Sequence, residues 1–512
     1  MTWLRRHRSA TEGVVAAVLL WLVLRVGWMS DDGLINIRTA LNLAHGNGVG
    51  FNAGERVQAF TSPLWFGLEY ALGRPTGEFI ITAILLGALC SVAAVALVAH
   101  AARSMRQAAF VFLAFAMSCS LIDFSTGGLE NGLAMLVTVL VLLAATRPLT
   151  SWWRWLLAGL AIGAALLVRQ DHVLLVGPVG ALLAWRGWRT DRRGLATLVA
   201  AAAVPVVVWS AVSWATFGSL VPNTLAAKTN VEISQWKLLG AGLNYLGVTA
   251  WSDPVIAVAM LLGVGVALWR GDALQRAAAA GVLVYVAYLL WIGGDFMAGR
   301  FLTTPAIVCL WLAATVEVPA VGRFDAGRVA WAAVGLVAAL GVWPMGVERP
   351  SSTSDPRWAL VDRHGVADEA AVWRAQGWTL SAALGDDTPI AFGEHADDYP
   401  DMHELQWLEA HWSHVVPAPK GVARPVKVIC GGIGGFGLDG GPELHVIDTC
   451  ALVDAFLADL PWHMPPSGYW RIGHWARELP AGYEDAVRFA DPSYVQDPVL
   501  RARLEELWRR IR

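Results

Sequence analysis

The sequence predicts a polytopic α-helical membrane protein that ends in a polar domain of mixed α/β structure. Three observations lead to this fold class. Of the 512 residues, 56% are hydrophobic and 15% are charged, whereas soluble domains carry about a quarter charged residues. Apolar runs follow one another as far as residue 346, and none after it is long enough to cross a bilayer. The charges between the runs alternate in sign from one side of the membrane to the other.

The apolar runs predict about eleven transmembrane helices, because a helix needs roughly 20 apolar residues to cross the hydrocarbon core and a packed bundle tolerates shorter ones. The predicted spans are 11–29, 79–100, 108–122, 131–146, 155–168, 173–185, 194–216, 254–269, 277–292, 301–317 and 329–345. The stretch 61–73 is either a further span or a helix on the membrane surface. The first run follows three arginines as a signal peptide does, but acidic residues replace the cleavage site, so we expect a retained helix.

Basic and acidic residues separate onto opposite sides of these spans, which sets the orientation. The loops on the N-terminal side hold Arg103, Arg106, Arg147, Arg154, Arg186, Arg189, Arg192, Arg193, Arg270, Arg276, Arg323 and Arg328. The opposite loops hold Asp31, Asp32, Glu55, Glu78, Asp123, Glu130, Asp171, Asp253 and Asp295. The basic side is cytoplasmic under the positive-inside rule. An odd number of spans then places residues 347–512 outside the cytoplasm.

The C-terminal region, 347–512, is predicted to be a compact periplasmic domain, and residues 1–346 the transmembrane catalytic domain. Two short β-rich pieces, 426–430 and 445–448, flank a glycine-rich turn. Cys430 and Cys450 are able to form a disulfide if the region lies outside the cytoplasm.

Two classes of function are excluded by the sequence. The residues 432–437 match the dinucleotide fingerprint as a string, but no helical pattern follows them and no nucleotide pool exists outside the cytoplasm. We therefore expect no nucleotide ligand. No basic surface typical of nucleic-acid binding occurs, so we expect no nucleic-acid partner.

The first outward loop carries the strongest candidate site. Adjacent carboxylates, Asp31 and Asp32, follow the first span directly, and such groups are costly near lipid unless they serve a site or remain solvated. A plain solvated helix end is the structural alternative. The spacing of Asp32, Ile35 and Arg38 predicts an amphipathic helix along the outer surface.

Four other outward segments end spans with polar residues: 128–131 with Glu130, 169–172 with Arg169 and Asp171, 221–229 with Asn223 and Lys228, and 293–300 with Asp295 and Arg300. Each alone is an ordinary loop end. Their common side favours one composite site.

As a set, these segments resemble a known family. The run "DDGLINIRTALNLAHGNGVGFNAGERVQAFTSPLW" is similar to the first outer loop of polyprenyl-phosphate-dependent arabinofuranosyltransferases of the GT-C superfold. "GGLENGL", "VRQDHVLL", "VPNTLAAKT", "GGDFMAGRFL" and the C-terminal "WRIGHWARELPAGY" follow in the expected order. Within the family, the chain resembles the terminal β-arabinofuranosyltransferases of actinobacterial cell-wall arabinan. Residues 170 and 171 depart from the family pattern, which has Pro and Glu there.

The resemblance implies a GT-C fold and an inverting transfer of arabinofuranose from a polyprenyl-phosphate donor to a cell-wall glycan, at the outer face of the bacterial plasma membrane. Asp32 or Asp31 is then the general base, and Asp32 is favoured because it leads the helix that carries Arg38. The phosphate-binding residues are Lys228, Arg300, Arg169 and Arg38. The substrate-binding residues are His45, Glu130, Asn223 and Asp295.

Some alternatives stay open at this point. No cofactor is required by the resemblance, but Asp31, Asp32 and Asp295 are able to serve as ligands of a divalent cation. The main alternative among enzymes is a GT-C transferase that uses another polyprenyl-phosphate sugar as donor, or a protein or another glycan as acceptor. A transporter of lipid-linked sugars is disfavoured because the sequence lacks the internal repeats and midplane breaks of that class.

Overall fold

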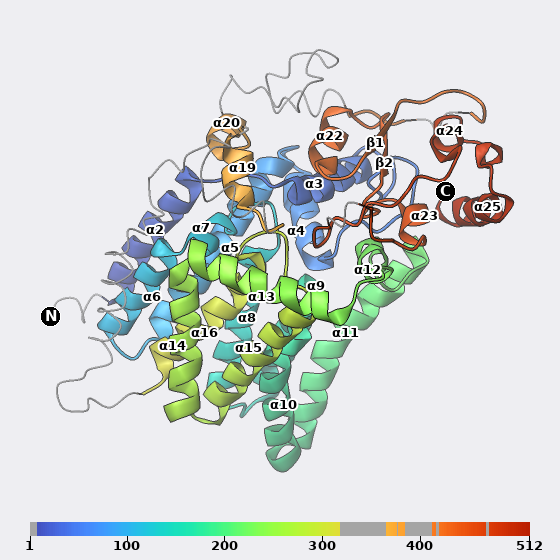
Figure 1. The fold of residues 1–512 in the computed structure, drawn as a ribbon. Helices are drawn as coiled ribbons and strands as arrows, with labels where there is room; N and C mark the ends of the chain where they lie inside the picture. Colours follow the sequence, from blue (N-terminus) through green and yellow to red (C-terminus); the bar gives the residue numbers. More distant parts are fainter. Residues whose placement is uncertain (1–7, 318–364, 376, 385–411, 416–418, 467–469) are drawn as a thin grey trace. The chain divides into compact units, whose positions relative to one another are not determined.

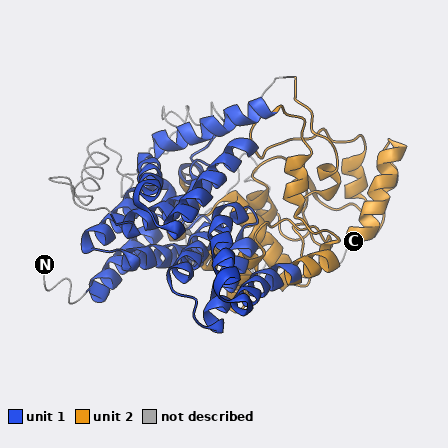
Figure 2. Cartoon of the chain, turned by 90° about the horizontal axis from the view of Figure 1, so that it is seen from below, with its two compact units in different colours: residues 1–28, 84–207, 235–372 blue, residues 29–83, 208–234, 373–512 orange. Residues whose placement is uncertain are grey.

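The computed structural model describes residues 8–317, 365–375, 377–384, 412–415, 419–466 and 470–512 (Figure 1). These residues divide into two compact units, coloured separately in Figure 2. Unit 1 comprises residues 1–28, 84–207 and 235–372, and unit 2 comprises residues 29–83, 208–234 and 373–512. Unit 2 therefore combines the C-terminal region with two segments from the first half of the chain. The domain boundary predicted near residue 346 lies outside the described residues.

Unit 1 is built from helices. They are α2 (Arg8–Arg25), α5 (Phe79–Ala101), α6 (Met105–Met117), α7 (Cys119–Asp123), α8 (Asn131–Thr146), α9 (Trp152–Val168), α10 (His172–Thr190), α11 (Arg192–Phe217), α13 (Gln235–Ser252), α14 (Pro254–Arg270), α15 (Ala273–Ile292), η1 (Arg300–Leu302), α16 (Thr303–Thr315) and α19 (Glu369–Ala375). Helices α5, α11 and α19 each also contain residues of unit 2.

Glycines allow the helices of unit 1 to approach closely. A Cβ atom at Gly281 in α15 would overlap the carbonyl of Leu175 in α10. A Cβ at Gly263 in α14 would overlap the backbone of Cys309 in α16. Small residues at such crossings are typical of helix packing in membranes, where close backbone contact replaces hydrophobic driving force.

Three helices among the described residues are long and apolar enough to cross a membrane: α5, α11 and α15. Helices α13 and α14 together form a fourth candidate, bent by 108°. Shorter apolar helices occur at Met105–Met117, Asn131–Thr146, Trp152–Val168 and Arg300–Thr315. The protein is thus a polytopic membrane protein, while the count of eleven spans stays a prediction. The predicted span 329–345 lies outside the described residues.

Helix α13 was missed by the sequence analysis, which placed no element between residues 216 and 254. Its apolar residues are diluted by Gln235, Lys237 and Asn244, so the run falls short of the pattern of a span. The bend after it follows from the sequence, because Pro254 lacks an N–H group and cannot continue a helix from Ser252. Asp253 caps α14 instead, and its Oδ1 accepts a hydrogen bond from the Ile256 N–H at 3.1 Å.

Unit 2 mixes short helices with two strands. Its elements are α3 (Asp31–Ala44), α4 (Pro63–Gly73), α12 (Asn223–Thr229), α20 (Leu380–Leu384), β1 (Val426–Ile429), α22 (Ile433–Asp439), β2 (His445–Asp448), α23 (Ala455–Ala458), α24 (Tyr483–Arg488), η3 (Pro492–Tyr494) and α25 (Pro498–Ile511).

Strands β1 and β2 pair in parallel, with a register that runs from Val426 opposite His445 to Ile429 opposite Asp448. Parallel strands need a crossover connection, and α22 supplies it. Both predicted β-rich pieces are confirmed. The structure also pairs Cys430 with Cys450, at a Cα separation of 5.0 Å.

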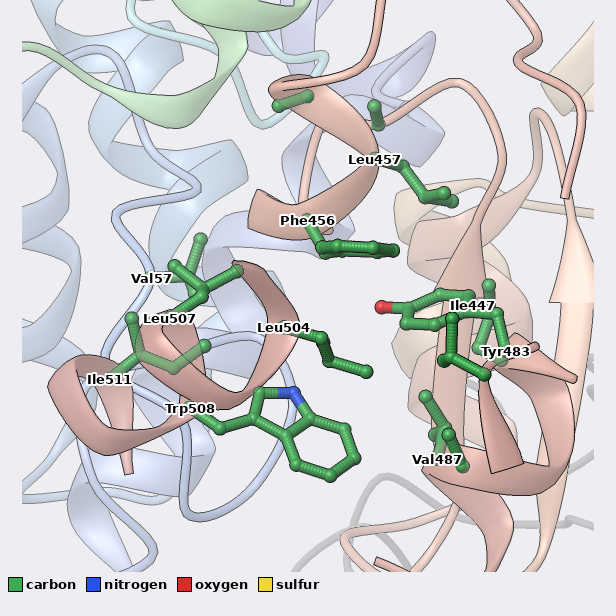
Figure 3. Packing of buried hydrophobic residues seen from close by; sticks show 14 of the residues in the cluster. Val57, Ile447, Phe456, Leu457, Tyr483, Val487, Leu504, Leu507, Trp508 and Ile511 are labelled. Atoms are coloured by element: carbon green, nitrogen blue, oxygen red, sulfur yellow. The ribbon is translucent and has the colours of Figure 1, made fainter. Parts of the chain in front are cut away.

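The hydrophobic core of unit 2 depends on the last helix of the chain (Figure 3). Leu504, Leu507, Trp508 and Ile511 come from one face of α25 and pack with residues of β2, α23, α24 and the loop at Val57. Asp497 begins α25 by accepting hydrogen bonds from the N–H groups of its first turn. The arginines and glutamates of the opposite face are exposed. The C-terminal helix is therefore part of the core that shapes unit 2.

We predict that Leu504→Ala destabilises unit 2 by about 2–5 kcal/mol, the usual cost of a cavity at a fully buried leucine. Thermal unfolding of the detergent-solubilised protein measures the change. The control is Glu505→Ala, which alters the neighbouring exposed residue of the same helix. Equal melting temperatures for Leu504→Ala and the control would contradict the role of α25 in the core.

Asp439 is an unfavourably placed acid at the C-terminal end of α22. The negative end of a helix disfavours a carboxylate, and no described residue donates a hydrogen bond to its Oδ1. Burial raises the pKa of Asp439 to about 8. The folded protein therefore keeps a proton that the unfolded chain, with an aspartate pKa of about 3.9, releases.

The pH dependence of stability follows from this difference. Between about pH 4 and pH 8 the folded state binds the extra proton, so the contribution of Asp439 to stability falls as the pH rises. We predict that Asp439→Asn raises the melting temperature more at pH 8 than at pH 5. Thermal unfolding of both proteins across this range measures the difference. An equal shift at every pH would show that Asp439 does not titrate there.

Candidate functional site

Helix α3 carries the predicted catalytic acids in its first turn. Ser30 caps the helix, and its hydroxyl accepts a hydrogen bond from the Gly33 N–H at 3.1 Å. Asp31 and Asp32 follow at the positive end of the helix, where the helix dipole stabilises negative charge. The predicted helix is confirmed, but its side chains from Gly33 to Asn42 are buried. The expectation of a helix with one solvated face was therefore wrong.

Helix α22 covers α3, and its glycines explain how. A Cβ at Gly434 would overlap the carbonyl of Asp31, and one at Gly437 would overlap the side chains of Phe51 and Arg38. The glycine string that matched a dinucleotide fingerprint thus serves helix packing. Gly434 and Gly437 lie within α22 itself, which ends at Asp439.

The two carboxylates differ in their surroundings. Asp31 is buried, and its Oδ1 accepts a hydrogen bond from the backbone N–H of Gly435 at 2.8 Å. Asp32 is half-buried and lies close enough to His474 to influence its ionisation. Asp31 is therefore held by α22, while Asp32 belongs to a charged group that also includes Lys228.

Arg38 is fully buried in unit 2 and bonded to backbone oxygens. Its Nε donates to the Phe51 carbonyl at 2.7 Å, its Nη1 to Gly441 at 3.1 Å and its Nη2 to Leu444 at 2.7 Å. Burial lowers the pKa of Arg38 to about 9. The guanidinium also lies over the Phe51 ring, with 4.7 Å between the Cζ atom and the ring centroid. A role in phosphate binding stays a prediction, whereas these contacts connect α3 to the C-terminal region.

Lys228 is exposed near the end of α12, which unit 2 fixes from two sides. The Asn223 amide donates to the carbonyls of Ala451 and Leu452 at 2.9 and 3.0 Å. Arg477 donates from Nη2 to the Ala227 carbonyl at 2.7 Å. Asn223, predicted to bind substrate, thus anchors the helix that presents Lys228.

His45 lies at the opposite end of α3 from the acid pair. Its Nδ1 donates to the Leu41 carbonyl at 2.9 Å, because a carbonyl oxygen can only accept. A helix of 14 residues is about 21 Å long. The structure therefore does not bring His45 together with Asp31 and Asp32.

In unit 1, the ends of α8, α9 and α10 hold a network of buried charges. The Nη1 of Arg169 donates to Glu130 at 2.7 Å, and its Nη2 and Nε donate to Asp171 at 2.7 and 3.0 Å. The hydroxyl of Tyr285 donates to the same carboxylate at 3.2 Å. Burial opposes the charges of both acids, but Arg169 holds the pKa of Glu130 and of Asp171 below the ordinary range.

Arg300 and Asp295 belong to this same network. Arg300 lies 3.9 Å from a carboxylate oxygen of Glu130 and 3.9 Å from one of Asp295. The Asn131 amide donates to the Arg300 carbonyl at 2.9 Å, which fixes η1 against α8. The structure thus brings together Glu130, Arg169, Asp295 and Arg300.

Three residues near these groups were not singled out by the sequence analysis: Tyr285, Arg471 and His474. The last two lie in the C-terminal segment "WRIGHWARELPAGY", which the resemblance included without giving its residues a role. The two arginines and one histidine spaced within this tryptophan-containing segment were the available signal. Tyr285 gave none, because a tyrosine inside an apolar run is ordinary.

Within the described ranges, no three side chains of His, Cys, Asp or Glu lie together as a candidate metal site. One carboxylate oxygen of Asp31 accepts a hydrogen bond from the Gly435 N–H.

The sequence is similar to those of two curated proteins. The chain is 30% identical over 451 residues to the terminal β-(1→2)-arabinofuranosyltransferase of Corynebacterium glutamicum, covering 78% of this chain and 60% of that protein. It is 27% identical over 544 aligned positions to the terminal β-(1→2)-arabinofuranosyltransferase of Mycobacterium tuberculosis, covering 90% of this chain and 82% of that protein. No protein-family model matches.

Among solved structures, the fold is similar to that of ArnT from Cupriavidus metallidurans, whose crystal structure contains undecaprenyl phosphate. The TM-score is 0.50 at 17% identity, over 87% of this chain and 86% of that one. This similarity concerns the fold alone.

The apolar helices and this fold define the class as that of polytopic membrane proteins with a fold similar to that of ArnT. The two curated proteins to which the sequence is similar are both terminal β-(1→2)-arabinofuranosyltransferases. The resemblance predicted from the motifs is thereby confirmed. The chain spans about three fifths of the length of the Corynebacterium protein.

We predict that Arg38→Lys destabilises unit 2 by about 2–4 kcal/mol. One ammonium group cannot serve three carbonyls in the geometry of the guanidinium fork, and buried acceptors left unpaired are costly. Thermal unfolding measures the loss, with Arg503→Lys on the exposed face of α25 as the control. An unchanged melting temperature together with weaker donor binding would instead favour the predicted phosphate-binding role.

Proposed function

We propose that this protein transfers arabinofuranose, with inversion, from decaprenyl-phosphoryl-arabinofuranose to a terminal hydroxyl of cell-wall arabinan. The acceptor belongs to arabinogalactan or lipoarabinomannan, and the reaction takes place on the periplasmic face of the plasma membrane. The names of the two curated relatives support the sugar and the linkage. The presence of undecaprenyl phosphate in ArnT supports a lipid phosphate as carrier.

The observation that carries the proposal is the paired acid at the start of α3. Asp31 is committed to the Gly435 N–H, so its carboxylate is a poor candidate for taking up a proton. Asp32, the next residue, is half-buried. It interacts electrostatically with His474, as Lys228 does. We therefore assign the general base to Asp32 and a positioning role to Asp31.

The reaction then follows from these positions. The acceptor oxygen attacks the anomeric carbon of arabinofuranose while Asp32 removes its proton. The bond between that carbon and the phosphate oxygen breaks, and the polyprenyl phosphate leaves with one more negative charge than the diester carried. Lys228 stabilises this charge as it develops.

The network in unit 1 has a supporting role in this proposal. Arg169 already pairs with Glu130 and Asp171, so a phosphate would have to compete with two buried carboxylates. Arg300 lies 3.9 Å from Glu130 and from Asp295 in the same network, so these charges fix the helix ends.

We predict that Asp32→Asn lowers the rate of arabinosyl transfer by about 10²–10⁴-fold, the usual contribution of a general base. The purified protein is incubated with polyprenyl-phosphoarabinose and a short arabinan oligosaccharide, and elongated product is measured. Asp459→Asn, at an exposed acid of unit 2, is the control.

Two outcomes would overturn parts of this proposal. No elongation by the wild-type protein with polyprenyl-phosphoarabinose, but elongation with polyprenyl-phosphomannose, would change the donor sugar. Full activity of Asp32→Asn would remove Asp32 as the base, and Asp31→Asn would then be tested in the same assay.

A further inference from the structure

The described residues 470–477 form a fixed turn in unit 2. The N–H of His474 donates to the Arg471 carbonyl at 3.1 Å, and these two residues form an isolated antiparallel bridge. Gly473 adopts a φ of 78°, a conformation that side-chain-bearing residues rarely tolerate. The rings of Trp470 and Trp475 stack on each other, with centroids 5.6 Å apart. The turn thus presents Arg471 and His474 from a rigid backbone.

Arg477 connects this turn to the helix that carries Lys228. Its Nη1 donates to the Trp475 carbonyl at 2.8 Å, and its Nη2 donates to the Ala227 carbonyl at 2.7 Å. Trp475 follows His474, and Ala227 precedes Lys228. One buried guanidinium therefore binds the backbone beside both residues.

A second chain of contacts leads from His474 to the acids of α3. A Cβ atom added to Gly431, which follows Cys430 of the disulfide, would lie 3.7 Å from the Cδ2 atom of His474. The next residue, Gly432, is the N-cap of α22, and that helix binds Asp31 through Gly435. The charges of Asp32 and Lys228 both act on the imidazole.

The protonation of His474 is consistent with this position. Burial, with a smaller contribution from Arg471 and Lys228, lowers the pKa of His474 to about 4, and Asp32 opposes this shift. Nδ1 lies 3.3 Å from the Ile472 carbonyl, which can only accept, so Nδ1 carries the proton. Nε2 of the neutral ring is then an acceptor, suited to a hydrogen bond from a cationic side chain.

We propose that Arg471 joins Lys228 in binding the phosphate of a polyprenyl phosphate, and that His474 positions these cations. The proposal rests on the proposed function, since it identifies the leaving-group site of that reaction. A phosphodiester carries one negative charge, and the polyprenyl phosphate released carries up to two near neutral pH. A second cation with a guanidinium fork therefore stabilises the leaving group more than the donor.

The test measures binding of farnesyl phosphate, farnesol and inorganic phosphate to the full-length protein, without any sugar. We expect Arg471→Ala to weaken farnesyl phosphate binding about tenfold or more, the usual scale for one charge-assisted hydrogen bond. Farnesol binding stays unchanged. Arg503→Ala on α25 is the control. Equal binding of farnesyl phosphate by Arg471→Ala and wild type would overturn the proposal, and binding of inorganic phosphate alone would replace the lipid by free phosphate.

Two substitutions of His474 test its positioning role in the same binding assay. We expect His474→Phe to weaken farnesyl phosphate binding severalfold, and His474→Gln, which keeps an acceptor, to restore most of it. A structural role would favour phenylalanine, whose ring fills the space. Should Arg471→Ala fail to fold, Arg471→Lys and Lys228→Ala carry the same measurement. Because no sugar is present, lost arabinosyl transfer with intact lipid-phosphate binding would contradict the proposed function and leave this site in place.

Discussion

The buried guanidinium of Arg38 is the interaction on which unit 2 depends. It bonds one carbonyl in the loop after α3 and two carbonyls between α22 and β2, residues some 400 positions later in the chain. A buried charge needs such partners, because removing it from water without compensation is expensive. The cost of burial therefore enforces one arrangement of α3 and the C-terminal region. The glycines of α22 allow this helix to pack directly against α3.

Arg477 repeats this solution for a third segment. It bonds the carbonyls of Ala227, Cys450, Leu460 and Trp475, and so joins α12 to the turns that follow β2 and precede α24. Both arginines use their charge on backbone oxygens.

In unit 1, the buried arginines pair with carboxylates and not with backbone oxygens alone. Arg169 pairs with Glu130 and Asp171 within hydrogen-bond distance, and Arg300 and Asp295 extend the group. Paired charges of this kind fix helix ends with little net gain in stability, because desolvation offsets much of the attraction. The network therefore acts on geometry: it fixes the ends of α8, α9 and α10 near the loop at Arg300.

The sequence by itself determined the membrane class, most helices of unit 1, the two strands and the family resemblance. These depend on hydrophobic periodicity and on local motifs, which require no knowledge of distant contacts. It also placed Glu130, Arg169, Asp295 and Arg300 on one side, which their grouping in unit 1 matches.

Only the tertiary structure decided which of the candidate residues already form hydrogen bonds with other parts of the protein. Arg38, Asn223 and His45 are suitable ligands as residue types, yet each bonds a backbone carbonyl. The structure also distinguishes the surroundings of Asp31 from those of Asp32. Asp31 accepts a hydrogen bond from the N–H of Gly435, a residue some 400 positions later in the chain. A sequence pattern shows which donors and acceptors a segment owns. Their partners are fixed by packing between segments distant in the chain, and no local pattern encodes that.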